Sequence, residues 1–318
     1  MKKSFISLLA AVLLFFVPAS GLGSPQKKTV VTSFYPIYIL ASNLTVGISD
    51  ITLLNLAAPD TGCLHDYQLL TGDMRTLSQA QVLLINGAGM EGFLNTVVEQ
   101  FPNLSIVDSS SNIPLLTLEG GEEHLHEEEM DEDHDHVHDH DHDHEDNAHI
   151  WLNAQNAIVM VKNLSAGLIA SFPEHVDTIT KNAEAYILRL KALDAELTQG
   201  LEKLKSTDII TFHEAFPYFA KAYGLNVAAV VNRDPGEALS PAQLAELVVQ
   251  VRTLNTPPLF TEPQYPDLAA RTLAAETGAQ VYELDPLVTG PVDERALTAY
   301  EDGMRKNMQI LIEALGVN

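Results

Sequence analysis

The sequence predicts an α/β protein of two lobes, each with a mainly parallel sheet flanked by helices, joined by one long helix. Three observations predict this fold. Residues 29–108 alternate short apolar runs with helical stretches, residues 208–284 repeat that alternation, and a long amphipathic stripe lies between them. Strand–helix–strand order implies parallel neighbours with helices on both faces. The predicted units are a signal peptide at 1–23, an N-terminal lobe at 24–153, a helical connection at 154–205 and a C-terminal lobe at 206–318.

In the N-terminal lobe, four apolar runs rich in β-branched residues predict strands. Pro36 follows the first run at once and marks a helix start, because proline is favoured in the first helical turn. The expected strands are 29–34, 51–56, 82–86 and 105–108, and the expected helices are 36–44, 71–79 and one ending near Gln100.

The connection begins with a predicted helix at 154–170, which carries one apolar stripe. Ser171 and Glu174 then match a capping box, and apolar residues recur every three or four positions as far as Leu204. Such a helix would be about 40 Å long. So regular a stripe is also typical of a coiled coil, but α/β sequence continues on either side and the heptad pattern does not. We therefore expect a helix lying across both lobes.

The C-terminal lobe repeats the pattern of the first. Ser240 before Pro241 is the expected N-cap of one helix. The expected strands are 208–212, 226–231, 259–261 and 280–284, and the expected helices are one ending at Tyr223, then 241–254, 268–277 and 297–315.

Residues 1–23 have the charged start, short apolar core and small residues of a secretory signal, and the apolar core is too short for a stable membrane span. No cysteine stands at the end of this segment or directly after it, so we expect a soluble periplasmic product without a lipid anchor. The net charge of −25 argues against nucleic-acid binding, which needs a basic face. Residues 122–146 hold 14 of the acidic residues and no Lys or Arg, leaving −11 for the rest.

That acidic tract is also rich in histidine. Its composition predicts disorder, because it has nothing apolar to bury. Acidity alone does not account for the histidines, however, since imidazoles and carboxylates together offer sites for divalent metals. We therefore expect residues 120–148 to form a disordered loop that binds metal weakly, apart from any tight site. Its candidate ligands are His124, His126, His134, His136, His138, His140, His142 and His144.

A tight metal site is predicted beyond the strand ends. His65, His213 and Asp285 each follow a predicted strand, where sites in parallel sheets lie, and His149 follows the acidic tract. Three nitrogens and a carboxylate would give Zn²⁺ its usual four donors. Any one of these histidines alone is more often structural, so the prediction rests on their shared placement. The single cysteine, Cys63, is either a soft ligand or a small buried residue.

An enzyme is the alternative from another class. His213 and Glu214 begin the H-E-x-x-H metalloprotease motif, but Pro217 stands where its second histidine belongs. A zinc-dependent hydrolase and a periplasmic zinc buffer are therefore two functions that these residues leave open.

Several motifs occur in the order found in the zinc and manganese solute-binding proteins of ABC importers. They are residues 30–36, 64–67, 86–87 with Glu91, 149–152, 213–216 with 218–219 and 222–224, and 262–264 with 284–287. The chain resembles this family over nearly all of its mature length, and within it the zinc-binding branch.

The resemblance implies a monomer without catalysis that binds Zn as its transported ligand in the cleft between the lobes and delivers it to an inner-membrane ABC permease. His65, His149 and His213 fall on the family's histidine-ligand positions, and Asp285 falls on a carboxylate position that some members use. Manganese-binding relatives carry Glu in place of His213, so a manganese or iron protein is the closer alternative. Cys63 departs from the family pattern, which leaves open whether it touches the metal.

Overall fold

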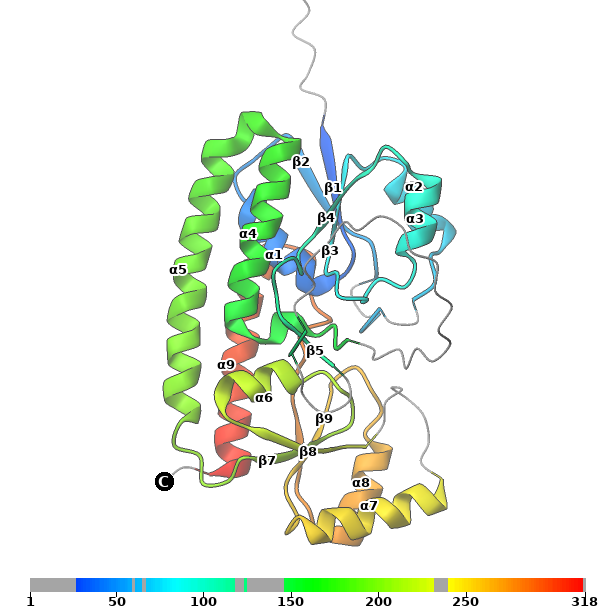
Figure 1. Cartoon of the computed structure of the whole chain (residues 1–318), viewed down its shortest axis with the longest axis vertical. Coiled ribbons are helices and arrows are strands. Elements are labelled where there is room, and N and C mark those ends of the chain that lie inside the picture. Colours follow the sequence, from blue (N-terminus) through cyan, green and yellow to red (C-terminus); the bar gives the residue numbers. More distant parts are fainter. Residues whose placement is uncertain are drawn as a thin grey trace, which may run out of the picture.

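The computed structural model describes residues 27–58, 61–64, 67–117, 123–124, 146–231 and 240–316. It contains two four-stranded parallel sheets, one in each lobe, and long helices that run along one side of both lobes (Figure 1). The fold class predicted from the sequence is confirmed. The predicted signal segment, 1–23, lies outside the described residues.

The sheet of the N-terminal lobe has the order β2-β1-β3-β4. β3 is buried along its whole length, as expected of a central parallel strand with both faces covered. Helices α2 and α3 lie on one side of this sheet and α1 and α4 on the other (Figure 1). The strands are β1 (Lys28–Thr32), β2 (Ile51–Asn55), β3 (Val82–Ile85) and β4 (Ser105–Asp108), and the helices are α1 (Tyr35–Thr45), α2 (Thr71–Leu77), α3 (Leu94–Gln100) and α4 (Ala154–Ser171).

A small element at the tract was not predicted. β5 (Leu115–Leu116) pairs antiparallel with β6 (Glu123–His124), and an isolated bridge joins Thr117 to Asp146. Because Asn147 N also donates to Leu116 O at 2.6 Å, the chain leaves the lobe and re-enters it at one place. The rest of the tract lies outside the described residues.

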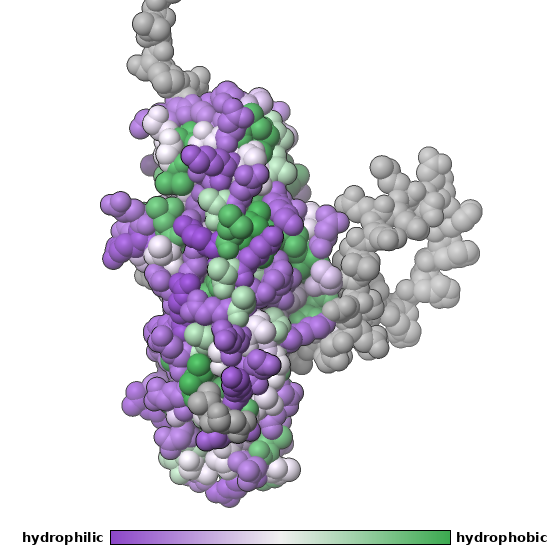
Figure 2. All heavy atoms as spheres, turned by 90° about the vertical axis from the view of Figure 1, so that its left-hand side faces the viewer, coloured by the Kyte–Doolittle hydropathy of each residue, from purple (hydrophilic) through white to green (hydrophobic). Residues whose placement is uncertain are grey.

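The predicted helix across both lobes is α5 (Val176–Leu201), which is 26 residues long and spans about 39 Å. It runs along both lobes and packs against α1, α4 and α9 (Ala296–Leu315) (Figure 1). The surface on this side of the molecule is mainly hydrophilic with separate apolar spots (Figure 2). The buried stripe of α5 consists of Ile179, Ala183, Tyr186, Leu190, Leu193, Leu197 and Leu201.

The capping box predicted at Ser171 is wrong. Ser171 is the last residue of α4, and its hydroxyl donates back to Gly167 O at 2.9 Å. A 3₁₀ turn, η2 (Pro173–His175), follows, and Glu174 pairs with Lys28 instead of capping a helix. At Ser240 the prediction is confirmed, because its side chain accepts from the backbone N of Gln243 at 3.3 Å.

The sheet of the C-terminal lobe has the order β10-β9-β7-β8. α7 and α8 pack together on one side of it, and α6 and α9 cover the side that faces α5 (Figure 1). No helix in the described part of the chain is long and apolar enough to cross a membrane. The elements are β7 (Asp208–Thr211), α6 (Pro217–Tyr223), β8 (Asn226–Val230), α7 (Pro241–Thr253), β9 (Leu259–Thr261), α8 (Leu268–Thr277) and β10 (Val281–Glu283).

Candidate metal centre

The segment before η1 (Ile150–Leu152) is fixed to both lobes. In the N-terminal lobe, Asn86 Nδ2 donates to Ala148 O at 2.9 Å. From the C-terminal lobe, the hydroxyl of Tyr218 donates to Asn147 O at 2.8 Å. His149, the next residue, is 2 % exposed. Its backbone is therefore held in place between the lobes.

Asn147 also sets the tautomer of the His149 ring, that is, which ring nitrogen carries the proton. Asn147 Nδ2 donates to Glu214 O at 2.8 Å, so its Oδ1 is the atom that faces His149. That oxygen lies 2.9 Å from His149 N and 3.1 Å from His149 Nδ1. Because a carbonyl oxygen only accepts, Nδ1 carries the proton and Nε2 keeps its lone pair. Such a partner orients a metal-ligating imidazole.

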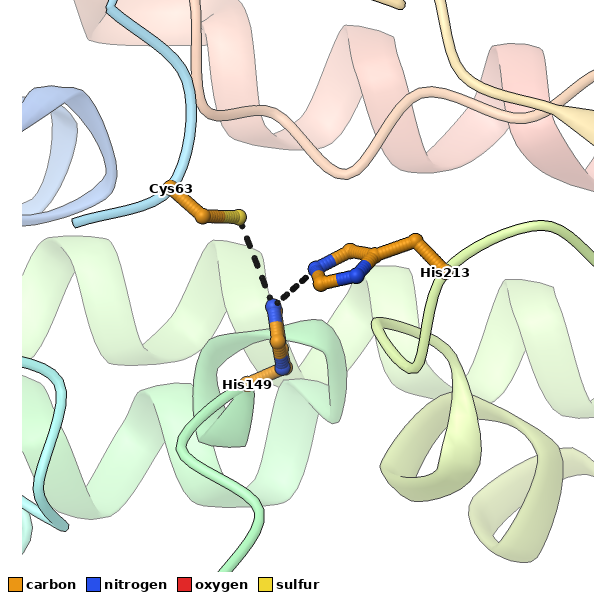
Figure 3. Close-up of side chains that lie close together, drawn as sticks. All are labelled: Cys63, His149 and His213. Carbon is orange, nitrogen blue, oxygen red and sulfur yellow. Dashed lines mark hydrogen bonds between the residues drawn. The ribbon is translucent and has the colours of Figure 1, made fainter. Parts of the chain in front are cut away.

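Two more side chains approach Nε2 of His149. His213, which follows β7 and is 4 % exposed, places its Nε2 3.1 Å from His149 Nε2. Cys63, in the loop after β2, places its Sγ 3.4 Å from the same atom. The three ligand atoms all lie within 4.8 Å of one another, and their side chains converge from three separate loops (Figure 3). Two nitrogens and a sulfur are donors that Zn²⁺ accepts.

The loop that carries Cys63 has one side chain in the core and one at the cluster. Leu64 is fully buried, whereas Cys63 keeps partial exposure as a residue. Gly62 before it adopts φ +84°, a conformation that favours glycine. Burial of the sulfur raises the pKa of the Cys63 thiol well above its ordinary value, and the charge of Glu262 adds to this effect.

The other predicted ligands are not part of the described cluster. Asp285 is not among the atoms gathered in the described cluster. Its Oδ1 accepts from Leu287 N at 2.8 Å, and burial raises its pKa. His65 lies outside the described residues, as do the side chains of the eight histidines of the tract. His175 lies elsewhere, with its Nε2 3.0 Å from Asp50 Oδ1 near the start of β1.

The profile of the family described as zinc-uptake complex component A, periplasmic (ZnuA), matches residues 30–314. The chain belongs to the ZnuA family. This match confirms the resemblance seen in the sequence motifs.

Among curated relatives, the zinc-binding lipoprotein AdcA of Streptococcus pneumoniae TIGR4 is 30 % identical over 98 % of this chain and 60 % of its own length. The chain thus spans about three fifths of the AdcA proteins that it matches. The high-affinity zinc uptake system protein ZnuA of Brucella abortus is also 30 % identical, over 90 % of this chain and 92 % of that protein.

The solved structure of the Zn(II)-bound ZnuA-like domain of S. pneumoniae AdcA is 26 % identical to this ZnuA-family chain. It has a TM-score of 0.72 and covers 91 % of this chain and 99 % of that one. FpvC of Pseudomonas aeruginosa in complex with Mn²⁺ has a TM-score of 0.74 at 22 % identity, over 91 % of this chain and 98 % of that one, and so shares the fold.

Sequence reasoning missed three residues around the cluster of this ZnuA-family protein: Asn147, Tyr218 and Glu262. Glu262 directly follows β9, and the strand-end rule that selected His213 and Asp285 would have found it. Glu262 is 4 % exposed, and burial raises its pKa to about 8, with the charge of Asp285 adding to the rise. Asn147 and Tyr218 gave no comparable signal, because their role depends on contacts between the lobes.

Glu91 supports the same segment from the N-terminal lobe. Its carboxylate accepts from Asn86 N at 2.8 Å and from Gly87 N at 3.1 Å, which fixes the turn that carries Asn86. Burial raises the pKa of Glu91 to about 7, although these hydrogen bonds oppose the rise. Glu91 is therefore a buried acid that positions Asn86, the residue whose side chain donates to Ala148 O.

The raised pKa of Glu91 predicts a pH-dependent stability of the metal-free protein. The folded state holds this proton more tightly than the unfolded state, so its contribution is complete below about pH 4.5 and is lost as the pH rises through about 7. The full change is about 3 kcal/mol. In Glu91→Gln the loss of stability over this pH range should be smaller by that amount, measured by urea unfolding at several pH values, while buried Glu262 keeps its own contribution. The exposed Glu99→Gln should keep the wild-type slope, and an unchanged slope in Glu91→Gln would contradict the assignment.

Proposed function

We propose that this chain is a periplasmic zinc-binding solute-binding protein that captures Zn²⁺ and delivers it to an inner-membrane ABC permease. The observation that carries the proposal is the convergence of Cys63, His149 and His213 from the two lobes and the segment between them. An ion bound by groups of both lobes favours one arrangement of the lobes, and a permease can distinguish that arrangement from the metal-free one. The names of the AdcA and ZnuA relatives support zinc as the ion.

The donor atoms favour zinc over manganese. Neutral imidazole nitrogens suit Zn²⁺, whereas Mn²⁺ prefers oxygen ligands and a higher coordination number. The fixed Nε2 lone pair of His149 and the nearby Nε2 of His213 supply two nitrogens. His65 remains the ligand predicted from the sequence, and Asp285 the predicted carboxylate. The histidine tract remains a predicted auxiliary site of lower affinity.

No part of this proposal involves catalysis. The ZnuA family consists of solute-binding proteins for zinc transport. We also propose that the domain limits follow the predicted ones, with lobes at 24–153 and 206–318, and that the protein acts as a monomer in the periplasm. The predicted export segment at 1–23 supports this location.

Metal competition tests the proposal. Protein lacking residues 120–146 is demetallated, given equal Zn²⁺ and Mn²⁺, dialysed and analysed for bound metal. We expect it to retain about one zinc per chain and essentially no manganese. His213→Glu replaces a nitrogen with a carboxylate and should narrow the preference for zinc.

Removing the tract ensures that the competition reports the folded site alone. His175→Glu, which changes another histidine in the same way at a distance from the cluster, should leave the preference as it is. Retention of manganese by the unmutated site would refute the zinc assignment.

A further inference from the structure

Cys63 is the third member of the ligand cluster, and sequence reasoning left its role open. Its Sγ and His213 Nε2 approach the same atom, His149 Nε2, from different directions (Figure 3). We propose that the Cys63 thiolate is a direct ligand of the metal ion, so that the site contains sulfur as well as nitrogen. This inference rests on the proposed function, because it requires that the cluster hold a metal.

Two of the three separations in the cluster are close to those around a shared ion. Zinc bonds of about 2.0 to 2.3 Å place neighbouring ligands of a tetrahedral site about 3.3 to 3.8 Å apart. The Sγ to Nε2 distance from Cys63 to His149 is 3.4 Å, and the distance between the two Nε2 atoms of His149 and His213 is 3.1 Å. Only small movements would give both pairs the separation that an ion requires.

The contact between Cys63 and His149 also has the chemistry of a site that a metal can enter. Because Nδ1 of His149 donates to Asn147, its Nε2 is the accepting atom in its contacts with His213 Nε2 and with the Cys63 thiol. When Zn²⁺ binds, the S–H bond breaks, a Zn–S bond forms and the proton leaves to solvent. The Nε2 lone pair of His149, which had accepted the hydrogen bond, then coordinates the ion.

Cys63 packs against the edge of the hydrophobic core, but that contact alone does not place its sulfur 3.4 Å from His149 Nε2. Leu64, its neighbour, is fully buried and anchors the loop in the core. Gly62, with its positive φ, turns the chain on the other side of Cys63. A sulfur 3.4 Å from His149 Nε2, in a cluster that also holds His213, has the position expected of a soft ligand.

Asp285 does not supply the third atom of the described cluster, and its Oδ1 already accepts a backbone hydrogen bond. Sulfur in place of that carboxylate makes the site softer. Soft thiolate selects for thiophilic ions such as Zn²⁺ and Cd²⁺ and against hard Mn²⁺. We therefore assign to Cys63 part of the discrimination between these two classes of cation.

Cobalt(II) substitution tests the assignment directly. Co²⁺ is added to demetallated protein lacking residues 120–146, and the absorption spectrum is recorded. Wild-type protein should show both the visible bands of bound Co²⁺ and the near-ultraviolet charge-transfer band of a sulfur–cobalt bond. Since Cys63 is the only cysteine, that band can arise from no other residue. Cys63→Ser should keep the visible bands, lose the near-ultraviolet band and bind Zn²⁺ at least about tenfold more weakly.

The outcomes separate this inference from the proposed function. Visible cobalt bands without a sulfur band in the wild type would overturn the role of Cys63 and leave the metal site standing. Failure of the wild type to bind Co²⁺ or Zn²⁺ would overturn the proposed function itself. A second measurement on unmutated protein guards against misfolding of Cys63→Ser: bound Zn²⁺ should slow alkylation of Cys63 by iodoacetamide at least about tenfold. Equal alkylation rates with and without Zn²⁺ would also overturn the inference.

Discussion

Replacing His149 by alanine should lower the affinity of the tract-deleted protein for Zn²⁺ by at least about 100-fold. Apparent free energies of about 10 to 16 kcal/mol for zinc held by four protein ligands correspond to roughly 2.5 to 4 kcal/mol for each ligand, and each 1.4 kcal/mol is about tenfold in affinity. The loss should be large here because the His149 ring is fixed by Asn147 before the ion arrives. Competition with a chromophoric zinc chelator measures the change. His213→Ala should have an effect of similar size.

The matched control is His175→Ala. It removes the same side chain, but the His175 ring lies against Asp50 near the start of β1, away from the strand ends that carry the cluster. Its zinc affinity should stay within about twofold of the wild type. An unchanged affinity in His149→Ala would show that the tight site is not where we place it.

Trp151→Ala should lower the free energy of unfolding by about 3 to 5 kcal/mol. The Trp151 side chain is 1 % exposed and packs edge-on against Phe34, with ring centroids 5.2 Å apart. Its Nε1 donates to Pro286 O at 2.7 Å, which ties the segment after the tract to the loop after β10. Urea unfolding of metal-free protein, followed by circular dichroism, measures the loss.

Two further variants make this test specific. Trp151→Phe keeps an aromatic ring but leaves the buried carbonyl of Pro286 without its donor, and it should cost about 1 to 3 kcal/mol. Leu188→Ala, at a side chain that is 67 % exposed on α5, should stay within about 0.5 kcal/mol of the wild type. If Trp151→Ala behaves like Leu188→Ala, the link between the lobes is not made at Trp151.

Most of the fold could be predicted because its signals are local. The apolar runs that became β1 to β4 and β7 to β10 were each visible as strands, and the stripe of α5 was visible as one long helix. The capping box at Ser171 failed because the same hydroxyl can also bond back within its own helix, and local sequence does not decide between these two partners. The short pair β5 and β6 gave no signal, since two residues are too few to show a period.

The candidate site was only partly predictable. Position after a strand selected His213 and Asp285, but that rule says nothing of which way a side chain points. Asp285 lies outside the described cluster, and Cys63, left open between two roles, lies within it. Deciding between them requires the contact between loops more than 80 residues apart, as in the pair Cys63 and His149.

Trp151 also lies beside the candidate metal centre. It is the only tryptophan of the chain, and its ring centroid lies 5.2 Å from that of the His149 ring. All indole fluorescence of this protein therefore originates next to the candidate metal centre. A paramagnetic ion such as Cu²⁺ at His149 would quench that emission through space, whereas closed-shell Zn²⁺ would act on it only through the charge and position of the ring. The chain thus carries its own optical probe, placed where the identity of the arriving ion can be read without a label.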